Sequence, residues 1–388
     1  MRVKIENMAD NLPTGKDIQK ISHGILRLQA MYNISANDVM SGNISHTSSH
    51  SPFSLDDAFD MARIAYETEY YFLAIDWLKI VTSQYDAAVT SFNVTNAMNL
   101  LSSAYYKLQQ PSKALSTLES VLKIDPNNQV AKRNKRFINM KINEGMLDKD
   151  VRYQLFKTKK DRLLQKICGD KNHESQRQGR LYCTLTAWRN RTLFDRPNIK
   201  TEIISFKPFI VVYHDFTTDS QRKAITHMGY EQMIDVMSKH HYSNPEGMNG
   251  LAVDDRTYWQ WVPSLKRALE NIDNTQRKPV HSQFVVRNIG LEGHENTPLE
   301  QSERTRLGTY LVFLTEPKYG GGDVVFPKLG IKVAPSKGDV LFYDRKVHRQ
   351  TTVCPLVSDT TWVGVYPIHE PLYSDVSFSD NLIRPKPT

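Results

Sequence analysis

The chain has 388 residues, of which 40% are hydrophobic and 24% charged, and its formal net charge is +8. This length and composition predict two or three domains with real cores. No apolar run approaches the roughly 20 residues that cross a bilayer, so we expect no membrane span. The basic clusters at 132–136 and 157–162 are typical of solvated helix surface and carry no recognition motif, which argues against a nucleic-acid partner.

Alanine-rich amphipathic helices are predicted in two pairs, 55–69 with 71–83 and 96–108 with 111–123. The pairing is typical of tetratricopeptide helix–turn–helix units, and Asp125-Pro126-Asn127 is a fitting closure of the second unit. Because one or two such units cannot form a long solenoid, we predict a short α-helical domain with a groove over residues 50–140.

A charged helix and an irregular basic connector follow, over residues 141–200. Clustered β-branched residues predict a strand over 202–214, and Thr218 or Asp219 is expected to cap a helix running to about Met237. The remaining short strands with Gly and Pro punctuation predict a double-stranded β-helix, or jelly roll, over 201–388 and an α+β protein overall. Its expected packing residues are Phe313, Val325, Phe326, Val340, Phe342 and Val363.

Four segments of this C-terminal region, 306–315, 320–327, 335–343 and 354–362, stand in an order that carries a family resemblance. They resemble the catalytic domain of the collagen prolyl 4-hydroxylase α subunit, and the likeness extends from about residue 12 to about residue 370. That family uses Fe(II), 2-oxoglutarate and ascorbate. The resemblance implies an iron site made of two histidines and a carboxylate, with a lysine that binds the 2-oxoglutarate carboxylate.

The family's functional positions map to other residue types in this chain. The first histidine and the aspartate fall on Pro298 and Glu300, the distal histidine on Thr351 and the lysine on Thr361. Proline has no ligating side chain, and a threonine hydroxyl is a poor substitute for an imidazole. A buried cosubstrate carboxylate without its cation is costly. We therefore expect a copy without catalytic activity.

An active oxygenase with a rebuilt site is the alternative, using His294, Glu300 and His348. A three-residue slip along a strand turns a side chain to the opposite face, so His348 would need a bulge to point inward. We interpret both histidines as loop or rim residues.

The helical domain of the family binds proline-rich, collagen-like peptide along a row of tyrosines. This row maps to Leu100, Ser103 and Tyr106, so one of three rings is retained. Flat aromatic walls suit an extended polyproline II chain, but the same rings also pack helical cores, and both interpretations stay open. The candidate peptide-binding residues are Tyr66, Tyr70, Tyr71 and Tyr106.

The resemblance also implies a partner and a compartment. Family α subunits work in the endoplasmic reticulum lumen with protein disulfide isomerase as β subunit. The polar start of this chain lacks a signal-peptide core, so we expect residues 1–49 to be a dimerisation region that has lost its first part. A family cysteine pair at the junction maps to Cys168 and Cys183, the expected disulfide.

Three functional hypotheses follow. The first is a non-catalytic relative that binds proline-rich peptide or a partner subunit. The second is the active Fe(II)/2-oxoglutarate oxygenase with a rebuilt site. The third is a helical-repeat scaffold unrelated to collagen chemistry.

Overall fold

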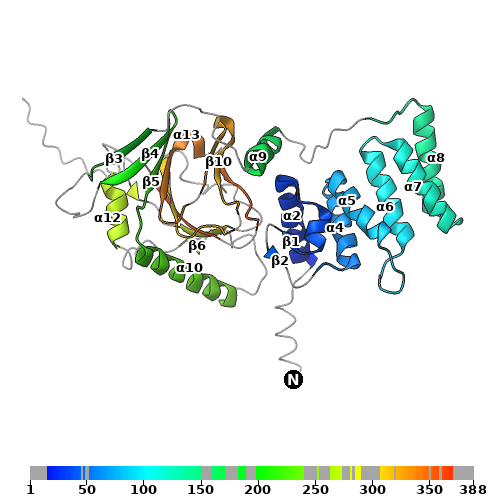
Figure 1. Ribbon diagram of the computed structural model, residues 1–388, viewed down its shortest axis with the longest axis horizontal. Coiled ribbons are helices and arrows are strands. Elements are labelled where there is room, and N and C mark those ends of the chain that lie inside the picture. Colours follow the sequence, from blue (N-terminus) through cyan, green and yellow to red (C-terminus); the bar gives the residue numbers. More distant parts are fainter. Residues whose placement is uncertain are drawn as a thin grey trace, which may run out of the picture.

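The computed structural model describes residues 15–44, 47–48, 52–149, 159–170, 182–188, 198–239, 251–252, 263–272, 280–281, 285–289, 306–318, 320–334, 336–348, 351–357 and 361–369. An array of helices precedes a β-rich part in the chain, and helix α9 (Lys159–Gly169) lies between them (Figure 1).

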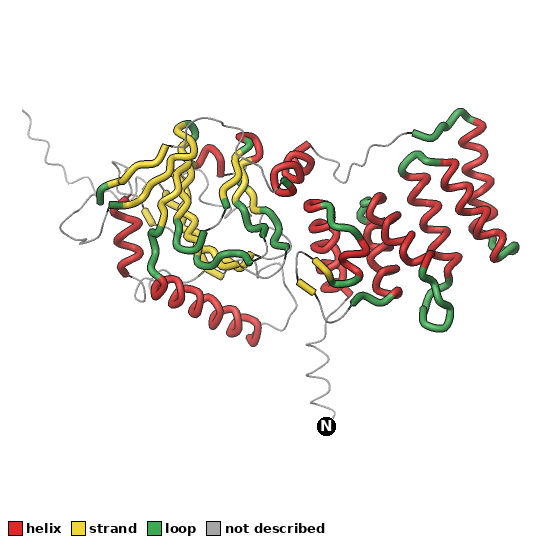
Figure 2. Tube along the Cα trace, in the orientation of Figure 1, coloured by secondary structure: helices red, strands yellow, loops and turns green. Residues whose placement is uncertain are grey.

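The helical array begins with α2 (Gly15–Tyr32), α3 (Ala36–Met40) and a short pair of strands, β1 (Asn43–Ile44) and β2 (Thr47–Ser48). Two helical hairpins follow, α4 (Leu55–Glu67) with α5 (Tyr71–Ser83) and α6 (Val94–Lys107) with α7 (Pro111–Ile124). Helix α8 (Gln129–Asn143) packs on α7 and ends the array. Figure 2 shows these helices stacked in sequence order.

Local signals explain where these helices begin and turn. Ser54 and Asp57 form a reciprocal capping box at the start of α4, and Asn93 caps α6. Each hairpin then turns through a residue in the left-handed region, Glu69 in the first and Gln109 in the second. The repeated geometry confirms the tetratricopeptide-like module, with helix ends within two residues of those expected.

A continuous apolar core joins the N-terminal segment to the repeats. Trp77 of α5 is fully buried, and its indole Nε1 donates a hydrogen bond of 3.0 Å to Oε1 of Gln29 in α2. Leu26 and Met31 of α2 belong to the same cluster as the buried residues of α4 and α5. Helices α2, α3, α4 and α5 therefore share one core.

Two antiparallel sheets make up the β-rich part. The larger has the strand order β3-β4-β5-β12-β9-β14-β8-β6, with β7 paired to β14, and the smaller has the order β11-β10-β13. The larger contains β3 (Tyr182–Thr186), β4 (Ile199–Phe206), β5 (Phe209–His214), β6 (Leu251–Ala252), β7 (Val280–His281), β8 (Val285–Ile289), β9 (Arg306–Phe313), β12 (Val340–Asp344) and β14 (Thr361–His369). The smaller contains β10 (Val324–Phe326), β11 (Ile331–Val333) and β13 (Thr352–Val353). Two short helices lie between strands: η2 (Pro327–Leu329) joins β10 to β11, and α13 (Arg345–His348) follows β12.

Alternation along the strands separates two apolar layers. Leu311 and Phe313 of β9 point between the sheets, where they join Phe326 of β10 in a buried cluster. Tyr310 and Val312 point to the outer face, which is covered by α10 (Asp219–Lys239) and α12 (Pro263–Ile272). This arrangement is the jelly roll expected from the sequence. Of its predicted packing residues, Phe313, Val325, Phe326, Val340 and Val363 are buried and Phe342 is half-buried.

The smaller sheet also contacts the helical part. Val324 and Phe326 face the jelly-roll interior, whereas Val325 between them joins the core of the helical array. Helix α9 packs against both α2 and β10. The outer face of the smaller sheet is therefore the surface on which the two parts meet.

Candidate functional site

Thr351, the expected position of the distal iron ligand, lies just before β13 and is 5% exposed. Its hydroxyl donates a hydrogen bond of 2.8 Å to the carbonyl of Val347 in α13. Next to it in space, the jelly-roll interior is lined by apolar side chains such as Val347 and Val353. The hydroxyl of Thr351 is thus engaged with the backbone, and a threonine hydroxyl does not fit a ligand of Fe(II).

Thr361, the expected position of the cosubstrate lysine, is the first residue of β14 and is 2% exposed. It pairs with Ile289 of β8 and shares a strand face with Val363, which belongs to the interior cluster. An uncharged threonine at this depth provides no cation for a carboxylate. Thr361 therefore does not fit the role of binding the carboxylate of 2-oxoglutarate.

The other expected positions lie outside the described residues. These are Pro298, Glu300 and His294; His348 ends α13, but its side chain is not described. Among the residues that the structure describes, no group of three His, Cys, Asp or Glu side chains is placed to hold a metal ion. Thr309 on β9 is fully buried, and its Oγ1 has no hydrogen-bond partner in the described part of the chain.

The expected disulfide between Cys168 and Cys183 is wrong. Cys168 of α9 is bonded to Cys354, with a Cα–Cα distance of 5.7 Å, and Cys183 is a free, exposed thiol. The packing of α9 on α2 and β10 brings Cys168 to the segment after β13, whereas Cys183 lies on the edge strand β3 across the jelly roll (Figure 1). The disulfide joins the helical part to the smaller sheet.

A cleft of about 170 Å³ lies on the helical array. Three helices line it, α4, α6 and α8, and α6 contacts both of the others. The cleft is lined by Tyr66, Ser102, Ser103, Tyr106, Lys107, Asn134, Phe137 and Ile138.

The tyrosines expected to bind peptide occupy different places around this cleft. Tyr66 and Tyr106 line it directly. Tyr71 contacts Tyr66 edge-on, with ring centroids 5.4 Å apart, and so supports the cleft from behind. Tyr70 precedes α5 and packs on the core of the array. Tyr105 faces away and is half-buried against both helical cores, where burial and then Asp76 raise its pKa.

Sequence reasoning missed Phe137 of α8 as a cleft residue. Its ring meets Tyr106 edge-on with centroids 5.5 Å apart, and 43% of the residue is exposed. Ser103 lies in the same cleft, while Leu100, one turn earlier, packs on the N-terminal core. The sequence predicted a highly charged helical stretch here, and the apolar spacing along α8 is the signal that could have indicated a further repeat helix.

Sequence reasoning also missed a charged cluster at the end of β5. His214 Nδ1 lies 2.7 Å from Asp339 Oδ2, and its Nε2 lies 3.0 Å from Glu202 Oε2. Burial works against the charged imidazole, but the hydrogen bonds and charges of the two carboxylates outweigh it and raise the pKa of His214. The three residues come from separate strands and loops, so no sequence spacing could reveal them. The cluster ties β4 and β5 to the loop before β12.

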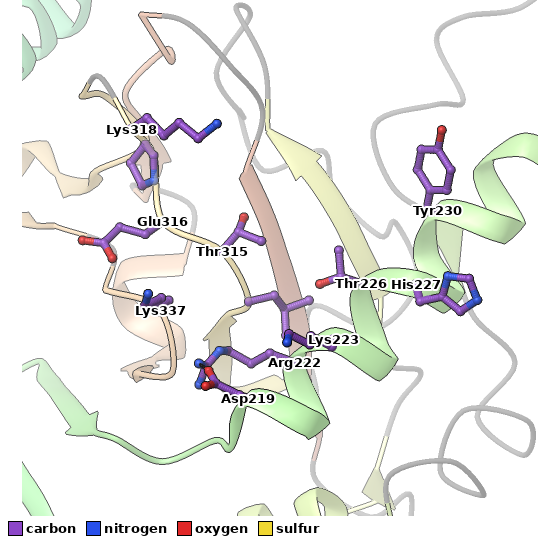
Figure 3. A pocket seen from close by; sticks show the side chains of 12 residues that line it. Asp219, Arg222, Lys223, Thr226, His227, Tyr230, Thr315, Glu316, Lys318 and Lys337 are labelled. Atoms are coloured by element: carbon purple, nitrogen blue, oxygen red, sulfur yellow. Dashed lines mark hydrogen bonds and ion pairs between the residues drawn. The ribbon is translucent and has the colours of Figure 1, made fainter.

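A wider cleft of about 930 Å³ lies on the outer side of the jelly roll, between α10 and the segment after β9 (Figure 3). Lys223, Lys318 and Lys337 line it together with Glu316, so its charge is mixed. Its lining comes from outside the two-sheet interior and includes neither Thr351 nor Thr361.

Comparisons with known proteins agree with this architecture. Residues 55–148 match the model of the prolyl 4-hydroxylase peptide-substrate-binding domain, and residues 1–46 match the N-terminal region of the prolyl 4-hydroxylase α subunit. The chain is 23% identical to prolyl 4-hydroxylase subunit alpha-1 of Caenorhabditis elegans over 92% of its own length and 70% of the relative's. It is 21% identical to the human subunit alpha-1, covering 92% and 74% of the two chains.

Among solved structures, a viral collagen prolyl hydroxylase from Paramecium bursaria Chlorella virus-1 matches with a TM-score of 0.32 and 16% identity. That match covers 42% of this chain and 90% of the viral chain. The two matched regions and the relatives matched over almost the whole chain agree with one another: this protein is similar to prolyl 4-hydroxylase α subunits along 92% of its length.

Proposed function

We propose that this chain is a non-catalytic α-subunit relative that binds proline-rich peptide through its helical groove. The observation that carries the proposal is the contrast between its two candidate sites. Thr351 and Thr361, to which the resemblance maps an iron ligand and a cosubstrate anchor, are buried beside apolar residues. The helical cleft, in contrast, presents the rings of Tyr66, Tyr106 and Phe137.

Aromatic rings on a helical groove suit proline-rich peptide for a physical reason. A polyproline II segment is already extended before it binds, so docking on rigid rings loses little conformational entropy. Tyr106 and Phe137 hold each other edge-on, which fixes the wall of the cleft. We expect the groove to bind such peptides in the absence of iron and 2-oxoglutarate.

The peptide-binding half is tested by titration calorimetry of the full chain with a peptide of repeated Pro-Pro-Gly triplets. Tyr106→Ala is expected to weaken binding about five- to tenfold, because an aromatic contact contributes roughly 1 kcal/mol beyond its buried area. Tyr230→Ala is the matched control, since Tyr230 is 50% exposed on α10 and lies outside this groove. An equal loss of peptide affinity in both variants would contradict the assignment of peptide binding to this groove.

The catalytic half is tested by peptide-dependent CO₂ release from 2-oxoglutarate with Fe(II) and ascorbate. We expect no release above background. Robust release that disappears in His294→Ala or His348→Ala would instead establish an oxygenase with a rebuilt site.

The partner and compartment follow from the family and are part of the same proposal. A surface contact with protein disulfide isomerase does not depend on the iron positions, so a non-catalytic relative can keep it. The Cys168–Cys354 disulfide supports an oxidising compartment such as the endoplasmic reticulum lumen. Co-purification with protein disulfide isomerase from a secretory-pathway host tests both; a chain recovered without it would leave only the peptide-binding role.

A further inference from the structure

Helix α8 enlarges the peptide groove beyond the two hairpins. It contributes Asn134, Phe137 and Ile138 to the cleft, opposite Ser103 and Tyr106 of α6. No second helix of a third hairpin is present in the described residues; the chain after α8 returns instead to the α6–α7 turn, where Ser112 N–H donates to the carboxylate of Asp148. Among the described residues, α8 is the last helix that lines the groove, and its side chains lie at one end of it.

The charge of this end is strongly positive. Helix α6 contains Lys107 and no Asp or Glu, and helix α8 contains five basic residues and again no Asp or Glu. The basic residues of α8 are Lys132, Arg133, Lys135, Arg136 and Lys141.

Three cations of α6 and α8 adjoin the cleft. Lys107 lines it directly, and the Nζ of Lys141 lies 5.9 Å from the centre of the Phe137 ring. Arg133 is exposed one turn before Phe137 and so stands on the same side of α8. Lys141 is paired with Glu144 at 2.6 Å, whereas Lys135 points to the other side and pairs with Glu119 of α7.

We propose that the groove selects extended proline-rich peptides that carry acidic residues, with the carboxylates lying over α6 and α8. This inference rests on the proposed peptide-binding function and adds the class of peptide. Prolines would pack on Tyr66, Tyr106 and Phe137 while Glu or Asp side chains reach Lys107, Arg133 and Lys141. Cations spaced beside an aromatic wall match a peptide in which apolar and acidic residues alternate.

The test compares three blocked peptides, repeats of Pro-Pro-Glu, Pro-Pro-Gln and Pro-Pro-Lys, titrated into the full chain. The acidic peptide is expected to bind about three- to tenfold more tightly than the glutamine peptide, since exposed charge pairs each contribute modestly. This preference should disappear in about 1 M salt, where the screening length falls to about 3 Å. The lysine peptide should bind most weakly.

Two variants locate the effect. Lys107→Gln is expected to reduce the preference for the acidic peptide over the glutamine peptide about twofold or more. Lys132→Gln is the control, because Lys132 lies two residues before the cleft residue Asn134 and therefore about 200° around the same helix.

The outcomes separate the inference from the function on which it rests. If all three peptides bind equally well, the charge selection is overturned and the peptide groove stands. If none binds, the proposed function itself fails. If both lysine variants weaken the acidic peptide equally, the attraction comes from the overall charge of the chain and the assignment to this groove is overturned.

Discussion

Tyr32, at the end of α2, donates a hydrogen bond of 2.6 Å from its hydroxyl to the backbone carbonyl of Pro355. Pro355 directly follows Cys354, whose disulfide partner Cys168 lies on α9. Two contacts therefore fasten the helical part to the segment that follows β13. In the same interface Lys332 pairs with Asp323 at 3.2 Å and donates to the carbonyl of Asp170. Thr351, the position of the expected iron ligand, is only three residues before this fastened cysteine.

Removal of the disulfide should destabilise the chain. Cys168 and Cys354 are 186 residues apart, and in the chain-entropy model a closed loop of that size contributes about 5 kcal/mol. Cys354→Ser is expected to lower the midpoint of chemical unfolding strongly, and Cys183→Ser should leave it unchanged because Cys183 is free. Peptide mapping without reduction checks the pairing; a Cys168–Cys183 peptide would contradict it.

The hydrogen bond of Tyr32 should contribute less to the free energy of unfolding than the disulfide does. Tyr32→Phe is expected to cost about 1–2 kcal/mol, because the carbonyl of Pro355 loses its donor in a partly buried place. Unfolding monitored in denaturant measures this. Tyr71→Phe, whose ring contact with Tyr66 is kept, serves as a control for loss of a hydroxyl.

Tyr32 should also make the chain sensitive to alkali. Burial, followed by the charge of Asp323, raises its pKa far above the ordinary tyrosine value of 10.0. The folded state thus keeps the phenol neutral while the unfolded chain ionises, so stability is complete below the unfolded pKa and is lost as pH rises above it. The wild type is expected to lose stability between about pH 9 and 11 more steeply than Tyr32→Phe; parallel curves would exclude this role.

The His214 cluster predicts a second pH dependence of stability, in which the protonated imidazole stabilises the fold. Two carboxylates face the ring, so the protonated imidazole donates from both nitrogens, whereas the neutral ring can donate only once. Since the folded pKa is raised, the stabilisation is complete below the unfolded pKa of about 6.5 and is lost as pH rises through the folded value. His214→Gln should lower the melting temperature more at about pH 6 than at about pH 9; an equal effect at both would contradict the prediction.

A new ring in the groove should strengthen peptide binding. Ser103 lies in the cleft with Tyr66 and Tyr106, so Ser103→Tyr is expected to raise the affinity for proline-rich peptide by about two- to tenfold. Leu100→Tyr is not expected to help, because Leu100 packs on the N-terminal core and a larger ring would strain it. Calorimetry on both single variants separates them; an unchanged affinity in Ser103→Tyr would mean that the cleft does not contact the peptide.

Local periodicity was enough to predict the helical hairpins and the jelly-roll frame. The capping box at Ser54 and the alternation through β9 are properties of short segments, and each can be interpreted without knowing what packs against it. The family resemblance mapped an iron ligand to Thr351 and the cosubstrate lysine to Thr361, and this assignment stays a prediction.

The tertiary structure alone decided the features that join distant segments. The family resemblance implied a disulfide between Cys168 and Cys183, but the packing of α9 against β10 determined which sulfur atoms meet. The sequence likewise did not indicate that Phe137 of α8 contacts Tyr106 of α6. The physical reason is the same in both cases: a disulfide or a cleft depends on distances in space, and those distances are set by long-range packing that separations along the chain do not encode.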